Sequence, residues 1–415
     1  MRNFVVLLLL LFSIEPIFSQ SLIKQHVQEN SIEIHSLNAV EKNDTDLDAI
    51  GKAIGEARVV MLGEQDHGDA AAFQLKTRLV RYLHEKKGFD VLAFESDFYG
   101  VTRGWDATVA GRLPLYQLIN QNVGPVWTRC NECTDLFDYV KSAFLTERPL
   151  ILAGFDPSTM YGYSRKNIIN EIDSFLLALN IPFTSTSAYK TSLLPLLQTI
   201  VQPPYPANPD SLLYSTAVMQ IDTVLIQVKA KRQQNELAIK SLESLQSNLR
   251  RMIAKEYFVR MEDRDKQMAD NLAWLTEVKY ANRKIIVWAA SYHIAKLESD
   301  KIRHRNMGSR YIAEATREKQ SYVMGFTSFG GKTTNWDRTF YEVSSPEKES
   351  VEGWLYGKGY EAAFFDLRGF RKRNPKGIEP FFMAGIRHLQ QKDDWTKFYD
   401  GVIYLKTMRP CTVGK

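Results

Sequence analysis

The chain has 415 residues, of which 44% are hydrophobic, 24% charged and 12% aromatic. This is the composition of an ordinary globular protein, which excludes disordered, collagen-like and coiled-coil chains and allows a core that needs no disulfide bonds. The 53 Lys and Arg residues against 48 Asp and Glu leave a net charge of +5, which on this length does not indicate a nucleic-acid partner.

The amino terminus has the pattern of a secretory signal peptide. Arg2 precedes an apolar run of nine residues, 4–12, and the small residue Ser19 follows. A helix of that length spans roughly 14 Å, too short for a hydrocarbon layer of about 30 Å. A membrane anchor is the alternative, but no later run of about 18 apolar residues appears. We therefore predict removal of residues 1–19 and export to the periplasm or secretion, without a stable membrane anchor.

The three cysteines are Cys130, Cys133 and Cys411. The spacing of the first two could form a redox pair, half of a zinc site or a local disulfide. A second metal-binding pair is absent and export favours oxidation, so we predict a disulfide between Cys130 and Cys133, with free thiols as the alternative. The sequence leaves open whether Cys411 has a partner.

The first elements predict a strand, a helix and a second strand. Residues 20–50 are polar and irregular, whereas the apolar, β-branched run 57–62 is typical of a buried strand. Helical spacing of apolar residues then indicates a helix from Asp69 to a stop at Gly88, and residues 89–94 form the next strand. This βαβ unit implies parallel strands.

Polar residues follow the predicted strands. Glu64 and Glu95 are expected just beyond the carboxyl ends of neighbouring strands, because the βαβ unit makes them parallel. The later apolar strands 149–155 and 284–289 lead into further polar residues, and additional strands are predicted over residues 322–326, 362–367 and 402–405. Ligands bind outside the carboxyl ends of strands in open α/β sheets, so these polar residues should converge there. They are Glu64, His67, Glu95, Asp156 and His293.

Helical spacing dominates residues 161–282, around a turn-rich stretch at residues 202–209. We predict a mainly helical insertion that covers the open end of the sheet as a cap, with one long helix from about Asp210 to Glu256. The predicted fold class is α/β, with a mostly parallel central sheet flanked by helices. The two parts of its α/β core are expected over residues 20–160 and 283–415.

Two histidines stand where catalysis is plausible. His67 and Glu64 lie three positions apart in a loop, close enough for the carboxylate to orient the imidazole or for both to touch one water. The alternative is a surface loop with an incidental histidine. His293 stands at a strand end, and its alternative is a hydrogen-bonded packing residue.

Glu95 follows an apolar strand directly, where burial disfavours the charged carboxyl and requires a partner or a raised pKa. Its alternative is a cap or a buried salt bridge. The candidate partners for that bridge are Arg103 and Lys76.

Arg264 lies on an otherwise apolar helix face, continued by Met268 and Leu272, which places a guanidinium on the inward side. An inward arginine suggests a carboxylate or anionic partner. The alternative is a structural pair with Asp265 or Asp270.

Several common motifs are missing from the sequence. It contains no G-x-S-x-G elbow, no H-E-x-x-H zinc helix, no G-x-x-x-x-G-K-[ST] phosphate loop and no G-x-G-x-x-G after a strand. Serine hydrolases, zincins, kinases and dinucleotide oxidoreductases are therefore disfavoured, and no cofactor is expected.

An ordered series of segments resembles the erythromycin esterase-like family and spans nearly the whole mature chain. The segments are residues 62–68 (LGEQDHG), 76–83, 88–89, 93–95, 154–156, 264–272, 288–293 and 398–403. The resemblance implies an α/β sheet with a helical cap and a metal-independent hydrolysis of macrolide lactone esters. By position, His67 and Glu64 would activate a water, Glu95 would orient the water or the imidazole, and His293 would face the same cleft. Arg264 and Asp156 match positions that line it.

The sequence departs from the family at two positions. Where the family usually has His-Asn-x-His, this chain has Ala290-Ser-Tyr-His293, so one expected imidazole is missing. Losing a positioned general acid or base commonly costs about 10²- to 10⁴-fold in rate. Lys76 also stands where the family often has an arginine. An ammonium group therefore replaces a planar guanidinium that could form two parallel hydrogen bonds.

We therefore predict a hydrolase that cleaves a small-molecule ester or lactone. His67 would be the general base, Glu64 and Glu95 would orient the water, and His293 or Lys76 would stabilise the oxyanion. A variant of this hypothesis recruits a divalent metal to four side chains, although no metal is expected. The alternative from another class is a catalytically silent ligand-binding homologue, and the sequence leaves the oligomeric state open. The four side chains of the metal variant are Glu64, His67, Glu95 and His293.

Overall fold

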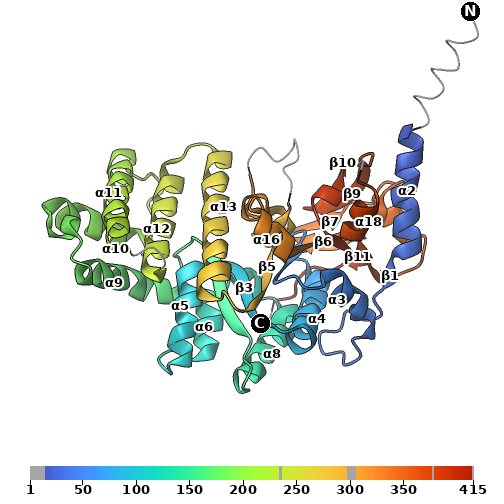
Figure 1. Ribbon diagram of the computed structural model, residues 1–415, viewed down its shortest axis with the longest axis horizontal. Helices are drawn as coiled ribbons and strands as arrows, with labels where there is room; N and C mark the ends of the chain where they lie inside the picture. The colour runs from blue at the N-terminus through green and yellow to red at the C-terminus, as the bar shows by residue number, and fades with distance from the viewer. Residues whose placement is uncertain (1–14, 233–235, 297–304, 376–377, 414–415) are drawn as a thin grey trace, which may run out of the picture.

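The computed structural model describes residues 15–232, 236–296, 305–375 and 378–413 (Figure 1). The predicted signal peptide, residues 1–19, therefore lies largely outside the described residues, and export stays a prediction.

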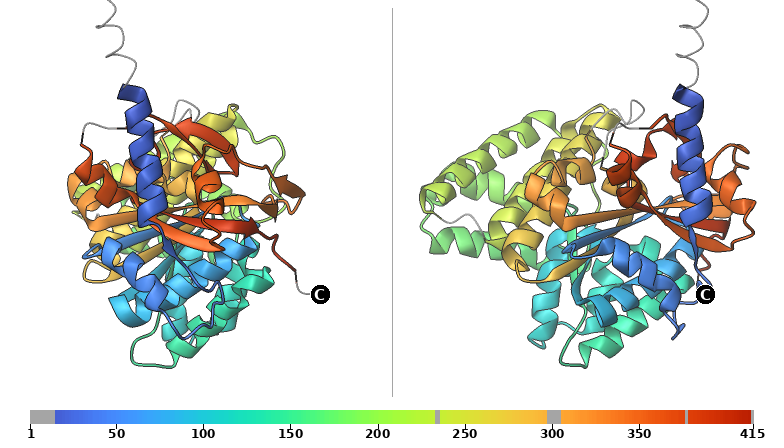
Figure 2. Two further views of the ribbon diagram at one scale, coloured as in Figure 1. Left: turned by 90° about the vertical axis from the view of Figure 1, so that its right-hand side faces the viewer. Right: turned by 45° about the vertical axis from the view of Figure 1, so that its right-hand side comes forward.

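A mostly parallel sheet forms the centre of the fold, and helices cover it (Figures 1 and 2). The pairs among β2, β3, β4, β5, β6 and β11 are parallel, whereas β1 and β8 run antiparallel to their neighbours. In spatial order the strands are β1 (Ile32–Glu33), β8 (Ala362–Asp366), β11 (Gly401–Met408), β6 (Ser321–Thr334), β2 (Val59–Glu64), β5 (Lys284–Ala290), β3 (Phe89–Asp97) and β4 (Ile151–Asp156). The end of β6 also pairs with β7 (Phe340–Val343), and β9 (Phe381–Ile386) forms a separate hairpin with β10 (Leu389–Asp393).

The predicted strands are confirmed, because they are apolar runs buried in the sheet, and most of their ends agree within about three residues. The exception is β6, which was predicted over residues 322–326 and continues to Thr334. All six residues of β2 are buried, as parallel strands covered by helices require. Between β2 and β3, the predicted helix is α4 (Ala70–Lys87), which ends at Gly88 in the left-handed conformation (φ 75°) that favours glycine. The sheet is flanked further by α3 (Asp48–Ile54), α5 (Phe98–Val109), α6 (Leu115–Asn122), α7 (Pro125–Thr128), α8 (Thr134–Phe144), α14 (Ser291–Ile294), α15 (Met307–Tyr311), α16 (Ala315–Gln320), α17 (Val351–Tyr356) and α18 (Leu367–Arg373).

One topological expectation was wrong. The strands that end near Glu64 and Glu95 are not neighbours, because β5 pairs with both β2 and β3 and lies between them. Nothing local in the sequence shows this, since β5 follows β4 only after a long helical segment.

Residues 20–50 are also more regular than predicted. They contain the end of α2 (Glu15–Asn30), the short strand β1 and the start of α3. Ile23 and Val27, four residues apart, are fully buried on one face of α2, which packs against α17 and β8 (Figure 2). Tertiary contacts with C-terminal elements therefore stabilise a helix whose sequence is otherwise polar.

The segment between β4 and β5 is helical and has its own apolar core. Its main helices are α9 (Gly162–Ala178), α10 (Leu194–Ile200), α11 (Ser211–Ala230), α12 (Leu237–Ile253) and α13 (Tyr257–Trp274). The single long helix predicted from Asp210 to Glu256 is wrong, because α11 ends at Ala230 and a separate helix, α12, begins at Leu237. The break lets Val224 and Leu245 join one buried cluster, which a continuous helix would keep apart. The helices extend away from the sheet, and α13 lies nearest to it (Figure 1). The proposed domain boundaries stay predictions.

Helix α11 is long and apolar enough, by length and composition, to be a candidate membrane span. Core helices of soluble proteins meet the same test, and one face of α11 packs in the helical core.

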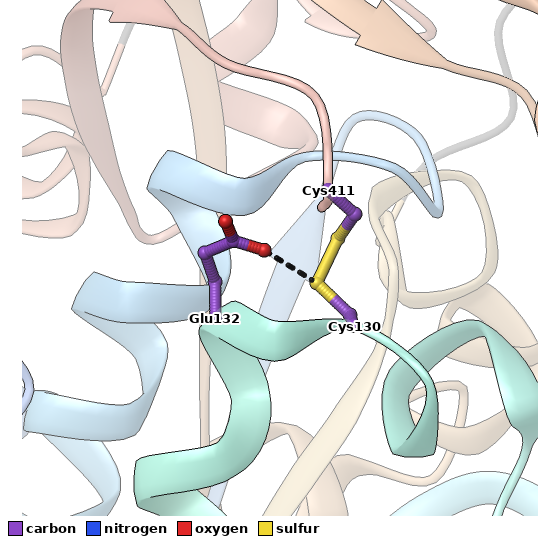
Figure 3. Close-up of side chains that lie close together, drawn as sticks. All are labelled: Cys130, Glu132 and Cys411. Carbon is purple, nitrogen blue, oxygen red and sulfur yellow. Dashed lines mark hydrogen bonds between the residues drawn. A yellow bond between two sulfur atoms is a disulfide. The ribbon is translucent and has the colours of Figure 1, made fainter. Parts of the chain in front are cut away.

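The disulfide joins Cys130 to Cys411, with 5.4 Å between the Cα atoms (Figure 3). Cys133 is a buried free thiol. The predicted bond between Cys130 and Cys133 was therefore wrong. Both residues lie within one short turn, where Cys133 packs inward between α7 and α8, whereas the C-terminal tail brings Cys411 to Cys130. Backbone bonds from Asn131 N to Thr412 O (2.9 Å) and from Cys411 N to Gly68 O (2.9 Å) hold that tail in place.

Replacing Cys411 with serine should lower the free energy of unfolding by about 2–4 kcal/mol, because the bond links residues 281 positions apart. Urea unfolding measures this loss, with Cys133→Ala as the control that removes a thiol without breaking the bond. Reductant should bring the wild-type midpoint down to that of Cys411→Ser and leave the variant unchanged. A wild-type midpoint that does not respond to reductant would contradict the disulfide.

Candidate active site

The loop after β2 carries His67 and is held by Asp69. One oxygen of Asp69 accepts hydrogen bonds from the backbone N–H groups of Gln65 (3.0 Å) and Asp66 (2.9 Å). Its other oxygen accepts from Thr333 Oγ1 (2.6 Å) and lies 2.9 Å from Nε2 of the buried His388. A fully buried carboxylate therefore fixes the backbone on which His67 stands.

The same loop is enclosed from two sides. Gly68 lies against β6, and an added Cβ there would come within 1.9 Å of Thr334 Oγ1. On the other side, the C-terminal tail bonds to the loop through Ala70 N to Arg409 O (2.9 Å) and through Cys411 N. The loop position thus requires glycine and depends on the tail that the disulfide anchors.

Glu64 is the centre of the first polar cluster. Its carboxylate is fully buried, pairs with Lys76, and accepts a hydrogen bond from Trp127 Nε1 at 3.3 Å. The same oxygen lies 3.3 Å from His67 Nδ1. Lys76 is also fully buried, with its Nζ 4.2 Å from the ring centroid of Trp288. The His67 side chain, in contrast, is 22% exposed and is the member of this cluster that reaches the surface.

The electrostatics of this cluster favour a charged His67. Burial opposes the positive charge, but the hydrogen bond with Glu64 and the charges of Glu95 and Asp66 raise the pKa of His67 to about 9. Burial lowers the pKa of Lys76 against the opposing pull of Glu64. At neutral pH most His67 side chains are therefore imidazolium.

Glu95 and Arg264 form the second cluster, to which α13 contributes. Arg264 Nη2 lies 2.8 Å from Glu95 Oε1, and its Nε donates to Asp156 Oδ2 at 2.8 Å. His293 Nε2 lies 3.3 Å from Glu95 and 3.0 Å from Arg264 Nη1, while its Nδ1 lies 2.6 Å from Asp265. The three carboxylates around Arg264 and His293, those of Glu95, Asp156 and Asp265, are thus each held by at least one contact with a basic side chain.

Burial opposes ionisation of both carboxyls in this cluster, but nearby cations outweigh it. His293 and Arg264 lower the pKa of Glu95, and Arg264 with Arg251 lowers the pKa of Asp156 to about 2. Burial likewise opposes the charge of His293, but Asp265 and Glu95 raise its pKa. The cluster therefore holds ionised carboxylates at neutral pH.

The two clusters meet at Ala290. Glu64 pairs with Ala290 in the β2–β5 register, and the backbone N–H of Ala290 donates to Glu95 Oε2 at 3.0 Å. The alanine that replaces the expected histidine therefore stands between the two glutamates.

A cavity of about 190 Å³ opens beside His67. Its walls are mainly apolar and include the disulfide, the end of β6 and the start of β7, with two arginines among them. The lining consists of His67, Val126, Arg129, Cys130, Thr334, Asn335, Trp336, Arg338, Phe340, Cys411 and Val413. Such a cavity suits a small apolar group next to the imidazole.

The structure brings together the residues predicted from the sequence, but with some different partners. Glu95 pairs with Arg264 instead of Arg103 or Lys76. Lys76 holds Glu64 and is fully buried, so its position suits support of the carboxylate better than contact with a substrate.

Sequence reasoning missed three neighbours, Trp127, Asp69 and Asp265. Trp127 stacks edge-on against His67 at 5.7 Å, and nothing in its own segment indicates that contact. Asp265 was considered only as a partner of Arg264, whereas it binds His293. Adjacent residues on a helix point in different directions, so Asp265 could have been expected to bind a partner other than its neighbour Arg264.

The four side chains of the metal hypothesis do not fit a shared ion as arranged. A divalent ion would have to displace Lys76 from Glu64 and Arg264 from Glu95. Within the described ranges, three ligand atoms gather closely at Cys130, Glu132 and Cys411, where Glu132 Oε2 lies 3.2 Å from Cys130 Sγ (Figure 3). Both sulfurs there belong to the disulfide and offer no thiolate.

The fold and the site define an α/β protein in which two polar clusters, each with one glutamate and one histidine, lie at the carboxyl edge of a parallel sheet. The family model for erythromycin esterase matches residues 84–408, so the chain belongs to that family. Glu64, His67 and Lys76 precede the matched range.

Known proteins support this membership over most of the chain. YbfO of Bacillus subtilis, which carries the name of a hydrolase, is 26% identical over 92% of this chain and 92% of its own length. Erythromycin esterase type II of Escherichia coli is 22% identical over 89% of this chain and 94% of its own. A crystal structure of a mutant of the erythromycin esterase EreC in its open conformation has a TM-score of 0.66 and 14% identity, covering 91% of this chain and 97% of that chain. The α/β fold with a central sheet flanked by helices is therefore confirmed.

Proposed function

We propose that this protein is an exported hydrolase that cleaves a carboxylic ester or lactone with water activated by His67. The observation that carries the proposal is the pair of His67 and Glu64 at the rim of the apolar cavity. The names of the two relatives, a hydrolase and an erythromycin esterase, favour the same chemistry. The substrate class is a small-molecule ester, which includes macrolide lactones without being limited to them.

The hydrogen-bond geometry suggests how His67 would act. Nδ1 faces Glu64, so a neutral imidazole that donates through Nδ1 leaves Nε2 to accept a proton from water. The hydroxide then attacks the carbonyl carbon, and the protonated Nε2 returns the proton to the leaving alcohol oxygen as the ester C–O bond breaks. Arg264 supplies positive charge for the oxyanion from the second cluster, and His293 lies 3.0 Å from its Nη1.

Export would be consistent with two features. The sequence of residues 1–19 has the signal-peptide pattern, and a disulfide between Cys130 and Cys411 persists best in an oxidising compartment.

The pH dependence of hydrolysis tests the role of His67. Because the pKa of His67 is about 9, the neutral base is scarce at pH 7, and kcat/KM should rise about tenfold per pH unit before levelling near pH 9. The assay uses residues 20–415 with an erythromycin-type lactone and a panel of simple esters, with and without chelator. Turnover that survives chelation supports the proposal, and loss with chelator points to the metal variant.

Two other results would contradict the proposed role. A rate that falls as pH rises through 9 would make the imidazolium the active form, an acid instead of a base. No turnover of any ester by folded protein would favour the silent ligand-binding homologue, for which the missing histidine at Ala290 is the supporting observation.

A further inference from the structure

A second cavity, of about 410 Å³, lies between the helical segment and the loop after β4. It is bounded by the loop that follows Asp156, by the loop between α10 and α11, and by the facing ends of α12 and α13. Its volume is that of a small-molecule site. The lining consists of Ser158, Thr159, Met160, Ile200, Tyr205, Pro206, Ala207, Pro209, Asn248, Arg251, Met252 and Arg260.

Arg251 in this wall is incompletely satisfied. Its Nη1 donates to Asn248 Oδ1 at 3.1 Å, but its Nε is buried and has no hydrogen-bond partner in the described part of the chain. Burial, together with the like charge of Arg264, lowers the pKa of Arg251. A buried cationic donor without a partner is costly, and an anion in the cavity would relieve that cost.

The nearby carboxylates are already paired with other arginines. Asp156 binds Arg264, and Asp263 binds Arg250 with 2.8 Å between Oδ1 and Nε. These aspartates attract the charge of Arg251, but within the described residues neither of them forms an ion pair with it.

A second arginine, Arg260, lines the same cavity, and Arg165 contacts one of the lining residues. Arg260 is exposed on its wall, and no ion pair of Arg260 is found in the described part of the chain. Arg165 donates from Nη2 to the hydroxyl of Tyr205 at 3.3 Å, and its buried Nε has no partner among the residues that the structure describes. The cavity wall therefore carries two arginines, Arg251 and Arg260, with Arg165 beside it.

The remaining walls are largely apolar. Met160, Ile200, Tyr205 and Met252 offer hydrocarbon and aromatic surface, and three residues of the turn-rich loop add more. A ligand that satisfies both kinds of wall must carry a negative group on an apolar body.

We propose that this cavity binds an amphipathic organic anion, with its carboxylate, phosphate or sulfate against Arg251 and Arg260 and its apolar body against Tyr205 and Met252. The anion is either one end of the substrate or a separate small molecule. Binding does not depend on hydrolysis, so this inference goes beyond the proposed function and can be tested without it.

Isothermal titration calorimetry with 4-phenylbutyrate and its neutral amide tests the charge requirement. The acid should bind at least tenfold more tightly than the amide to the wild type. Arg251→Met should remove this preference, Arg260→Gln should reduce it, and Arg112→Gln, an exposed arginine outside the cavity, should leave it unchanged. Equal affinities of acid and amide for the wild type would overturn the proposal.

Circular dichroism would show whether Arg251→Met folds. If Arg251→Met is misfolded, Arg260→Gln still tests the site, because it changes an exposed side chain. A preference for the acid that is as strong in Arg260→Gln as in Arg112→Gln would count against the site. His67→Ala should bind 4-phenylbutyrate as the wild type does, which separates failure of this inference from failure of the proposed hydrolysis.

Enzyme kinetics on the full mature chain distinguish whether the anion is part of the substrate or a separate ligand. If the anion is part of the substrate, kcat/KM for a carboxylated ester over its neutral analogue should fall in Arg260→Gln and not in Arg112→Gln. If it is a separate ligand, 4-phenylbutyrate should change hydrolysis of a neutral ester without competing with it. Either result supports the anion site. The site is overturned if 4-phenylbutyrate only competes with the ester and its inhibition is the same in Arg251→Met and Arg260→Gln as in the wild type.

Discussion

His67→Ala should lower kcat/KM for ester hydrolysis by about 10²- to 10⁴-fold, because it removes the positioned base beside the cavity. The side chain is 22% exposed and lies at the rim of the first cluster, so its removal leaves Glu64 paired with Lys76 and Trp127. The expected loss is in kcat, since the proton transfer belongs to the transition state. The measurement is initial rate at pH 9 on the ester that the wild type hydrolyses best.

His35→Ala is the matched control, since His35 is an exposed histidine outside both clusters. A His67→Ala variant that keeps more than a tenth of the wild-type rate would show that another group activates the water. The folded pKa of His67 exceeds its unfolded value, so His67 contributes stability that is fully present below about pH 6.5 and lost as pH rises through 9. In thermal melts, the Tm of His67→Ala should therefore lie below that of the wild type at pH 6, and this difference should be smaller at pH 9.

The central strands of this fold were predictable because each is a continuous apolar run, whereas the partly exposed strands β7 and β10 were not predicted. Burial on both faces requires such runs, and β2, β3, β4 and β5 all satisfy that requirement. The helix α4 was predictable for a similar reason, since it combines apolar spacing with a glycine stop.

The order of the strands and the disulfide were not predictable, because both depend on contacts between distant segments. The insertion of β5 between β2 and β3 follows from the path of the chain after a long helical segment. Cys130 meets Cys411 because the C-terminal tail bonds along the His67 loop, whereas the sequence shows only the nearby Cys133.

The candidate site was predicted in part because its residues stand at strand ends. Glu64 and His67 meet as their spacing indicated, and Glu95 and Asp156 meet through Arg264. The sequence could not show that Ala290 separates the two glutamates, since this depends on strand register. That register places position 290 next to both clusters.

Arg264→Met should lower the free energy of unfolding by about 3–5 kcal/mol, because it leaves two buried carboxylates without their shared cation. Glu95 and Asp156 are buried, and Arg264 lowers the pKa of both. Without it, the pKa values of both carboxyls should rise, because burial opposes their charge. The variant should then gain stability as pH falls and protons bind, so its deficit is larger at pH 8 than at pH 5. Urea unfolding at both pH values measures the difference.

Arg250→Met is the matched control, because Arg250 pairs with Asp263 in the same region but both side chains are more exposed. Its expected cost is within about 1 kcal/mol and independent of pH over this range. An Arg264→Met variant as stable as Arg250→Met would show that Glu95 and Asp156 do not need the guanidinium. Arg264→Lys should recover only part of the loss, because one ammonium cannot reproduce the separate contacts of Nε and Nη2 with two carboxylates. The same geometry couples stability to function, since the cation that stabilises the fold also sets the charge beside His293.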